Sequence, residues 1–439
     1  MMKTFAGLHY DASDQTETTQ SPWRASCVAG MGSAVEYYDF AIYGLLASTL
    51  AKVFFPGLSS FEALLSTLAV FASAFVMRPL GGIFFGRLGD RRGRTVTLIA
   101  TVVGIGAVSG IVGVLPTYEH VGILAPALLV ACRMAQGFFA GGEVSGAATY
   151  ISECAPAGKR GFFGAFNPAG VAIGLAAAAA MAGTVTSVLT PDEMAEWGWR
   201  IPFISCIPFI GLTLWARMKL EDSPKFKTLV QSNHVLKAPI REVFRSHRKS
   251  LLLAVAIAFA QNSCAYLGIV YLNIHMTRTL GYETGKVFWL MAVCELVAAL
   301  AMPLFGGLSD RLGRRRLMIV GYASYILLIP SSMYLMGFGS FTLACAACML
   351  AFVPFAITQA QGYTVYTELF PTRVRYTGIA LGFNLGAVLG GASTPYICTW
   401  LVGNTGFQLS PAVWVAVAAA VAIVALANMN DISRQELTN

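Results

Sequence analysis

Four charged side chains lie inside long apolar stretches of this sequence, where an ionised group is costly. Glu36 and Asp39 stand three residues apart in the first stretch, Arg78 lies in the second and Arg133 in the fourth. Burial favours the neutral form of a carboxyl group and a neighbouring arginine favours the ionised form, so a carboxylate between these effects can load and release a proton. An arginine keeps its proton. We therefore predict a proton-carrying role for Asp39 first and Glu36 second, with static pairs Glu36–Arg78 and Asp39–Arg133 as the alternative.

Neutral polar side chains share helix faces with these charges, or lie near the middle of later apolar stretches. Tyr43 lies four residues after Asp39 and Gln136 three after Arg133, spacings that place each pair on one helix face. Such groups can hydrogen-bond the oxygens of a small ligand held between helices. The predicted ligand-binding residues are Arg133, Arg78, Tyr43, Gln136, Asn262, Tyr266, Gln359 and Asn384. Amides also join helices to one another, and that interpretation stays open for part of this set.

The remaining candidates for chemistry have structural interpretations. Glu143, near the end of the fourth stretch, is predicted to pair with a nearby arginine, whereas Glu295 in the eighth faces either a cavity or another helix. Cys345 and Cys348 form a CxxC inside an apolar stretch without a second pair or a nearby histidine, so we predict no metal site and no cofactor. No HExxH or GxSxG motif is present, and we do not expect an enzyme.

These residues belong to a chain that is too apolar to be water-soluble. Hydrophobic residues make up 56% of the 439 positions and charged residues 12%, against roughly 25% charged in soluble domains. A membrane-spanning helix needs about 20 mostly apolar residues. Runs of that length occur at 25–51, 62–86, 95–115, 121–145, 161–188, 200–217, 250–275, 286–308, 316–337, 341–366, 376–402 and 411–428. The sequence therefore predicts an all-α integral membrane protein with twelve transmembrane helices.

The placement of charge predicts how the chain crosses the membrane. Most of the 30 Lys and Arg residues lie on alternate connections and on the tails, which indicates that those connections and both termini are cytoplasmic. The net charge of +8 is then a topology signal, and we expect no nucleic-acid partner. The predicted parts are a cytoplasmic N-terminal tail at 1–24, an N-terminal six-helix half at 25–217, a cytoplasmic linker at 218–249, a C-terminal six-helix half at 250–428 and a cytoplasmic C-terminal tail at 429–439.

Two loop sequences occur twice, once in each half. Residues 86–94 (GRLGDRRGR) return at 306–314 (GGLSDRLGR), and the Glu-x-x-Pro at 153–156 returns at 368–371. A repeat of half the chain length in an apolar sequence is typical of secondary transporters built from two homologous halves. Acids and arginines at matched helix ends can pair and close the cytoplasmic side. The simpler alternative is that the basic loops only set the orientation of the chain in the membrane. The predicted gate residues are Asp90, Arg91, Arg94, Glu153, Asp310, Arg311, Arg314 and Glu368.

The doubled loop resembles the best-known motif of the major facilitator superfamily, and the Glu-x-x-Pro segments resemble its usual partner. Three further stretches narrow the resemblance to the metabolite:proton symporter family: EYYDF at 36–40, RMAQGFFAGGE at 133–143 and WGWRIPF at 197–203. Members of that family carry organic acids, shikimate-like compounds, or proline and betaine. The resemblance implies two homologous six-helix halves and transport by alternating access.

We therefore predict a proton-coupled secondary active importer, a symporter, of a small organic carboxylate, located in the cell membrane. An arginine at mid-depth suits an anion; we assign Arg133 to the substrate and Arg78 to the carboxylates of the first helix. The alternative is uptake of a zwitterionic osmolyte such as proline or betaine. Against it, only a short tail follows the last helix, whereas osmosensing relatives carry a long C-terminal coiled coil. The expected partners are substrate, protons and lipid, and the expected state is a monomer.

Overall fold

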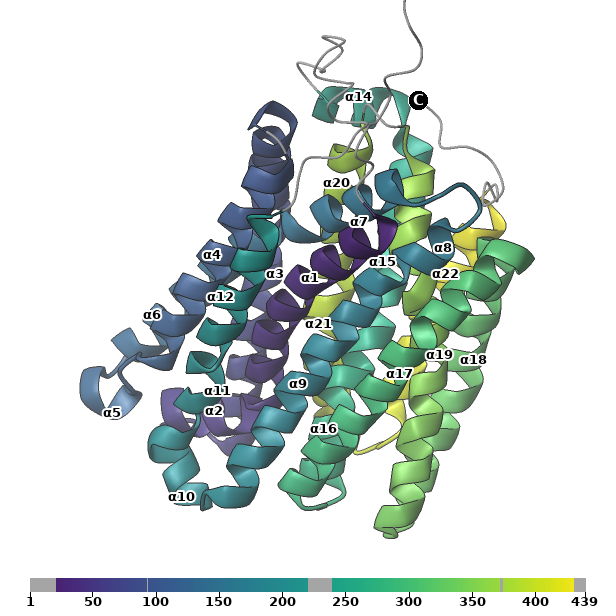
Figure 1. The fold of residues 1–439 in the computed structure, drawn as a ribbon. Coiled ribbons are helices and arrows are strands. Elements are labelled where there is room, and N and C mark those ends of the chain that lie inside the picture. The colour runs from purple at the N-terminus through teal and green to yellow at the C-terminus, as the bar shows by residue number, and fades with distance from the viewer. Residues whose placement is uncertain (1–20, 93, 220–238, 372–373, 430–439) are drawn as a thin grey trace, which may run out of the picture.

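The computed structural model describes residues 21–92, 94–219, 239–371 and 374–429, and it leaves the side chains of 89–95 and 239 undescribed. Throughout the described ranges the chain is helical and contains no strand. The long helices share one general direction and stand side by side, as expected for a bundle that crosses a membrane (Figure 1).

The N-terminal half begins with a helix whose first residue is Pro22, a position where the missing backbone N–H has no helical partner to lose. The next long helix continues through Pro79 without a break. The elements of this half are α1 (Pro22–Leu45), α2 (Ala47–Phe54), α3 (Ser60–Arg92), α4 (Arg94–Gly113), α5 (Tyr118–Val121), α6 (Leu124–Ala140), α7 (Glu143–Cys154), α8 (Arg160–Gly164), α9 (Phe166–Val188), α10 (Pro191–Glu193), the π-helical turn η1 (Met194–Gly198), α11 (Arg200–Ile204) and α12 (Cys206–Arg217).

The second part of the chain begins with a short helix that lies in the predicted linker and continues as the C-terminal half. Three π-helical turns interrupt the long helices of this part. Its elements are α14 (Pro239–Ser246), α15 (Arg248–Tyr266), η2 (Leu267–Tyr271), α16 (Leu272–Ile274), η3 (His275–Thr279), α17 (Thr284–Leu312), α18 (Arg314–Met336), α19 (Phe341–Leu369), α20 (Arg375–Ala387), η4 (Val388–Ala392), α21 (Ser393–Thr405) and α22 (Ser410–Ala427).

The membrane-spanning character of the helices confirms the predicted fold class. Within the described residues, 10 helical segments are long and apolar enough to cross a membrane, and the bent pair Pro191–Gly198 and Arg200–Arg217 makes 11. The first predicted span corresponds to α1, which is 24 residues long but carries Glu36 and Asp39. Those two carboxylates lower its hydropathy, and α1 is not among the segments that are apolar enough to cross a membrane by themselves.

Glycines at four-residue spacing allow helices within the N-terminal half to approach closely. A Cβ added to Gly137 would lie 1.7 Å from the carbonyl oxygen of Ala74, and one added to Gly141 would lie 2.1 Å from that of Arg78. Helices α3 and α6 are therefore packed backbone to backbone. This contact fixes the depth at which α3 presents Arg78.

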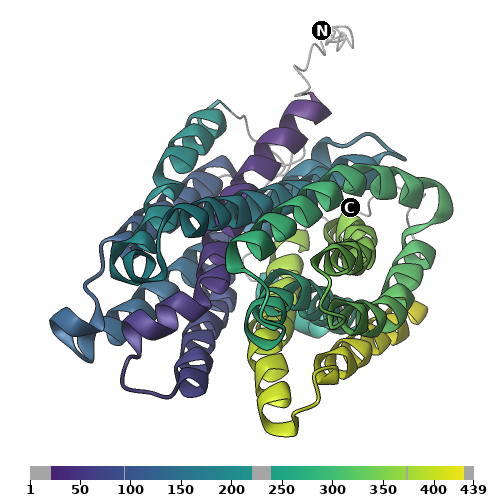
Figure 2. The same ribbon diagram turned by 90° about the horizontal axis from the view of Figure 1, so that it is seen from below.

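The two halves face each other along an interface that runs through the bundle. Helix α9 of the first half packs along α17 of the second, and α3 packs against α20. Seen from below, the purple-to-teal elements lie on one side and the green-to-yellow elements on the other (Figure 2). A ligand bound between these two sets of helices would contact both halves.

Candidate functional site

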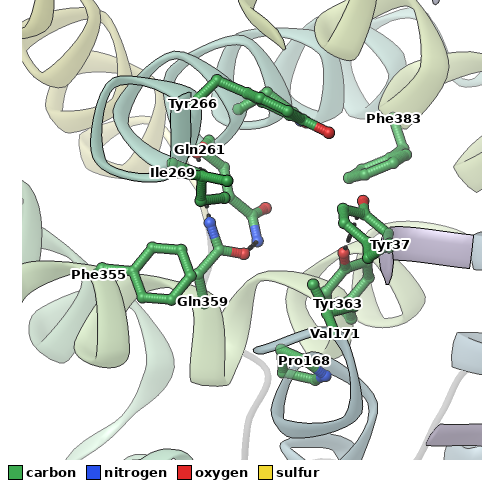
Figure 3. Close-up of a pocket in the computed structure, with 12 residues that line it drawn as sticks. Tyr37, Pro168, Val171, Gln261, Tyr266, Ile269, Phe355, Gln359, Tyr363 and Phe383 are labelled. Atoms are coloured by element: carbon green, nitrogen blue, oxygen red, sulfur yellow. Dashed lines mark hydrogen bonds between the residues drawn. The ribbon is translucent and has the colours of Figure 1, made fainter. Parts of the chain in front are cut away.

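A small pocket lies between the halves and takes its lining from both (Figure 3). The lining residues are Tyr37, Pro168, Val171, Gln261, Asn262, Ala265, Tyr266, Ile269, Phe355, Gln359, Tyr363 and Phe383. Its solvent-accessible volume is about 10 Å³, which is room for roughly one water molecule. The pocket is therefore closed around its own side chains in this conformation.

Two amides and a phenol form a hydrogen-bonded group on one side of the pocket. The Gln261 Nε2 donates to Gln359 Oε1 at 2.6 Å, and Gln359 Nε2 donates to the backbone oxygen of Gln261 at 3.3 Å. The hydroxyl of Tyr366 donates to Gln261 Oε1 at 2.5 Å. These bonds fix the orientation of both amides, so their polar atoms are pre-positioned at the pocket wall.

Aromatic rings form the rest of the wall. Figure 3 shows Tyr37, Tyr363 and Phe383 opposite the amides, with Tyr266 above them. The hydroxyls of Tyr37 in the first half and Tyr363 in the second lie 3.4 Å apart and link the halves. The hydroxyl of Tyr266 is buried without a hydrogen-bond partner. It is a polar group available to a ligand.

Three of the eight predicted ligand-binding residues line this pocket, namely Asn262, Tyr266 and Gln359. The others do not line it: Arg78, Arg133, Tyr43, Gln136 and Asn384. No charged side chain occurs among the described residues that form the lining. Substrate binding by the five residues outside the lining stays a prediction.

Arg78 is paired with a carboxylate of the first helix, as one of the two sequence interpretations had it. Its guanidinium donates to Glu36, and both side chains are fully buried. The cation also lies 4.4 Å from the ring centre of Phe40 and 4.9 Å from that of Phe75. It lies 5.8 Å from the ring of Tyr37. Tyr37 therefore separates this ion pair from the pocket that it lines.

Asp39 and Arg133 belong to a second buried network a turn further along α1. Asp39 Oδ1 accepts from Ser109 at 2.5 Å and from the Gln136 amide at 2.8 Å. Arg133 donates to Gln136 Oε1 at 2.9 Å and lies 3.5 Å from Asp39 Oδ2. Its cation also lies 4.6 Å from the ring centre of Tyr43. The long Arg133–Asp39 distance makes Gln136 and Ser109 the closer partners of this carboxylate.

Glu143 has the partner type predicted for it. It lies fully buried at the start of α7 and forms an ion pair with Arg217 of α12. The same carboxylate accepts from the Thr101 hydroxyl at 2.9 Å. This pair joins three helices of the N-terminal half and leaves the carboxylate no open face toward the pocket.

Asn384 joins the two halves instead of lining the pocket. Its Nδ2 donates to the backbone oxygen of Gly141 at 3.0 Å. The hydroxyl of Tyr376, on the same helix α20, donates to the oxygen of Gly142 at 2.9 Å. Both contacts meet the turn between α6 and α7, where the glycines leave the carbonyls accessible.

The C-terminal copy of the repeated loop contacts the N-terminal half at one end of the bundle. Asp310 Oδ1 accepts from the backbone N–H of Gly161 at 2.9 Å and its Oδ2 from that of Phe162 at 3.0 Å. A Cβ added to Gly306 would lie 2.3 Å from the carbonyl oxygen of Gly161. The two halves therefore approach each other here as closely as their backbones allow.

Two arginines extend this contact. Arg314 lies 2.8 Å from Asp310 and 3.2 Å from Glu368, within the C-terminal half. Arg160 of the N-terminal half lies 3.6 Å from Glu368. Glu368 is thus shared between an arginine from each half, an arrangement that opposes separation on this side.

The N-terminal copy of the loop is described only in part. Asp90, Arg91 and Arg94 fall among the residues whose side chains lie outside the description. Glu153 lies near the end of α7 and Arg311 near the end of α17, at the same side of the molecule as Asp310. Whether the first copy forms a contact like that of Asp310 stays a prediction.

A larger pocket opens at the opposite end of the interface, with a solvent-accessible volume of about 430 Å³. Lys52 and Ser48 border it from the first half, and Arg278 and Asn273 from the second. Arg278 crosses between the halves, with its Nε donating to Ser48 at 2.9 Å and its Nη1 to the hydroxyl of Ser60 at 3.2 Å. The structure thus has a tight contact between the halves at the end that carries Asp310, a closed central pocket and an open vestibule at the opposite end.

Comparison with known proteins gives the family. A model of the Major Facilitator Superfamily matches residues 29–390. A proline/betaine transporter of Salmonella typhimurium is 32% identical over 424 residues, covering 94% of this chain and 84% of that protein. A shikimate transporter of Escherichia coli is 31% identical over 392 residues, covering 87% of this chain and 89% of that protein.

The fold has a solved counterpart. The structure of the proton:xylose symporter XylE bound to 6-bromo-6-deoxy-D-glucose matches with a TM-score of 0.74 at 19% identity, covering 95% of this chain and 97% of that one. Two repeated halves with a pocket between them are the usual architecture of secondary transporters. The chain belongs to the Major Facilitator Superfamily and is a multi-pass membrane transporter.

Sequence reasoning missed several residues of the site. Tyr37, Phe355 and Phe383 line the pocket, but aromatic residues in an apolar stretch look like ordinary helix-packing residues. Ser109 is the closest partner of Asp39, and a single serine in a spanning helix carries no signal by itself. The EYYDF stretch contained the one available indication, because it puts Tyr37 directly beside the predicted carboxylates.

Proposed function

We propose that this protein is a proton-coupled importer of a small zwitterion of the proline and betaine class. The observation that carries the proposal is the central pocket, which is lined by aromatic rings and neutral amides. A ligand with no net charge leaves no uncompensated charge in such a pocket, whereas an anion does.

The two ends of a betaine match the two sides of the pocket. The face of an aromatic ring attracts a quaternary ammonium, which has no N–H to donate. Tyr37, Tyr363 and Phe383 supply rings on one side, and the amides of Gln261 and Gln359 supply polar atoms on the other. The proline/betaine transporter at 32% identity supports the same substrate class.

The organic carboxylate expected from the sequence is not supported. That expectation needed an arginine free to bind an anion at mid-depth. Arg78 is occupied by Glu36, Arg133 by Gln136 and Asp39, and neither lines the pocket. Although a shikimate transporter is 31% identical, the lining lacks the cation that would fix such a substrate, so the zwitterion is the better candidate.

Proton coupling belongs to the carboxylates of α1 in this proposal. Asp39 has neutral partners at closer range than its arginine, so it can exist in both protonation states without losing all of its hydrogen bonds. Glu36 pairs directly with Arg78 and is the second candidate. The Asp310 and Glu368 contacts would act as the cytoplasmic gate that opens when the vestibule closes.

The membrane arrangement completes the proposal. The basic connections favour both termini in the cytoplasm of a cell membrane, and each half contributes to a single pocket, so a monomer suffices for transport.

Thermal unfolding of the purified protein with added ligands tests the substrate class. Glycine betaine and proline should raise the unfolding temperature, since a ligand at 100 times its Kd stabilises the folded state by about 2.7 kcal/mol. Tert-butylacetate, which has carbon in place of the betaine nitrogen, is the matched control and should give no shift. Stabilisation by shikimate or tert-butylacetate but not by either zwitterion would refute the assignment.

A further inference from the structure

One more acidic side chain lies buried within the spanning helices, and the proposed function does not use it. Glu295 in the middle of α17 is 2% exposed, and its Oε2 has no hydrogen-bond partner. Within the described part of the chain, no lysine, arginine or histidine forms an ion pair with it. It differs in this respect from Glu36, Asp39 and Glu143, each of which has an arginine nearby.

The groups around Glu295 are weakly polar and uncharged. Glu295 is close enough to interact electrostatically with Tyr325 of α18, Cys348 of α19 and Cys294 of its own helix. Helix α9, on the other side of α17, contains no titratable residue between 166 and 188. The charged side chains and the histidine of the remaining packed elements lie toward the helix ends. They are Arg160 of α8, Arg314, Arg315 and Arg316 of α18 and Glu368 of α19 at one end, and His275 and Arg278 of η3 toward the vestibule.

An ionised carboxylate cannot remain in such a place without a partner. Desolvation of a lone charge is far more costly than protonating the group, so a buried carboxyl without a cation is held neutral. Neutral Glu295 carries a proton at mid-depth in the C-terminal half. A change in its surroundings during the transport cycle, such as entry of water or approach of a cation, would release that proton.

A row of buried phenols connects this carboxyl to the central pocket. The rings of Tyr325 and Tyr322 lie 6.3 Å apart on α18, and both hydroxyls are buried. Tyr322 is an electrostatic neighbour of Tyr366. The hydroxyl of Tyr366 donates to Gln261, whose amide lines the pocket.

We propose that Glu295 is a second proton-binding site of the transporter and that the hydroxyls of Tyr325, Tyr322 and Tyr366 link it to the substrate pocket. One proton leaves the carboxyl as each hydroxyl, or a water between two of them, accepts one proton and donates another. No group changes its oxidation state, and no tyrosine remains ionised.

Infrared difference spectroscopy tests proton binding without any substrate. Purified native protein at neutral pH should show a carbonyl band of a protonated carboxylic acid that is missing from the Glu295→Gln variant. The Glu283→Gln variant, altered at an exposed position where α17 begins, should retain the band. A carboxylic-acid band that is the same in E295Q as in the native protein would overturn the proposal.

Proton counting in proteoliposomes tests the link to transport, and this arm rests on the proposed function. E295Q and Tyr325→Phe should each move one proton fewer per glycine betaine than native protein, and Tyr334→Phe, altered at an exposed ring on the same helix, should keep the native ratio. The native ratio in both E295Q and Y325F would overturn the link. If native protein takes up betaine without protons, the proposed coupling fails, and the infrared result still decides whether Glu295 holds a proton.

Discussion

The interiors of the two halves hold their polar groups in opposite ways. In the N-terminal half, buried carboxylates lie beside buried arginines: Glu36 with Arg78, Asp39 with Arg133, and Glu143 with Arg217. In the C-terminal half, the polar groups that line the pocket are amides and phenols, and Glu295, in the middle of α17, has no ion-pair partner among the described residues.

This difference separates two tasks that a symporter must combine. Charges that compensate each other within the N-terminal half can exchange a proton while the pocket beside them stays electrically neutral. The neutral wall from the C-terminal half can then bind a zwitterion whether or not the proton is present. Tyr37 is the point of contact, since it lies near Arg78 and its hydroxyl lies 3.4 Å from that of Tyr363.

Replacing Asp39 by Asn should have the largest effect, because it makes the N-terminal network permanently neutral at its proton site. Accumulation of betaine against its gradient should disappear, while exchange of labelled for unlabelled betaine continues. Glu36→Gln should do less, since Glu36 is paired directly with Arg78 and lies outside the pocket lining. Uptake assays with and without a proton gradient measure this, and native accumulation by D39N would leave Asp39 with a structural role only.

Breaking the Glu36–Arg78 pair should destabilise the protein without weakening substrate binding. Arg78→Leu leaves a buried carboxylate without its partner, which costs about 3–5 kcal/mol. The double variant Glu36→Gln/Arg78→Leu removes both charges and should recover most of that loss. Thermal unfolding and betaine affinity are measured on the same samples. A double variant that is stable but binds betaine weakly would place Arg78 in the substrate site. It would contradict the idea that proton binding and substrate binding are divided between the two halves.

A methyl group at Gly306 should open the cytoplasmic contact, because its Cβ would meet the Gly161 carbonyl at 2.3 Å. Overpacking of this kind costs about 1–3 kcal/mol, enough to shift the population toward the inward-open state. The neighbouring Gly307→Ala is the control, since its Cβ would lie 3.6 Å from the nearest atom of Phe162. Labelling of cysteines placed in the central cavity from the cytoplasmic side reports the shift. Equal labelling of both variants would count against the gate.

The smallest effect concerns single rings of the pocket. Tyr363→Leu removes one aromatic face and should weaken betaine binding by about 0.5–2 kcal/mol, the range of a cation–π contact. Tyr363→Phe keeps the face, loses only the hydroxyl contact to Tyr37, and should bind betaine more tightly than the Leu variant. Proline, whose ammonium carries N–H groups, should be less sensitive to the Leu change. Equal affinities of the Leu and Phe variants would argue that the ring does not face the ammonium.

The fold was predictable because its signals are long or repeated. Spanning helices need only sustained apolar runs, and the duplicated GxxxDRxGR loop indicated two halves. The contact of Asp310 with backbone N–H groups also agrees with the idea that acids at those helix ends hold the halves together. The first helix shows the limit of this approach, because it carries Glu36 and Asp39 and is not among the segments that are long and apolar enough to cross a membrane.

The site was predictable only in part, for a physical reason. Charged residues in apolar helices stand out, so Glu36, Asp39, Arg78 and Arg133 were found, but the sequence does not show whether an arginine faces a ligand or a carboxylate on another helix. The pocket is built from residues that also make ordinary helix packing, such as Phe355 and Phe383. The organic carboxylate followed from assuming free arginines, and the paired geometry removes that assumption.

Uptake of labelled glycine betaine into proteoliposomes with an imposed pH gradient tests the central claim most directly. We predict that betaine accumulates when the outside is acidic and that protons enter with it. Accumulation should collapse when a protonophore is added, and it should not require sodium. Proline should compete with betaine, and tert-butylacetate should not. Accumulation that survives the protonophore but needs sodium, or uptake that tert-butylacetate blocks and proline does not, would contradict the account.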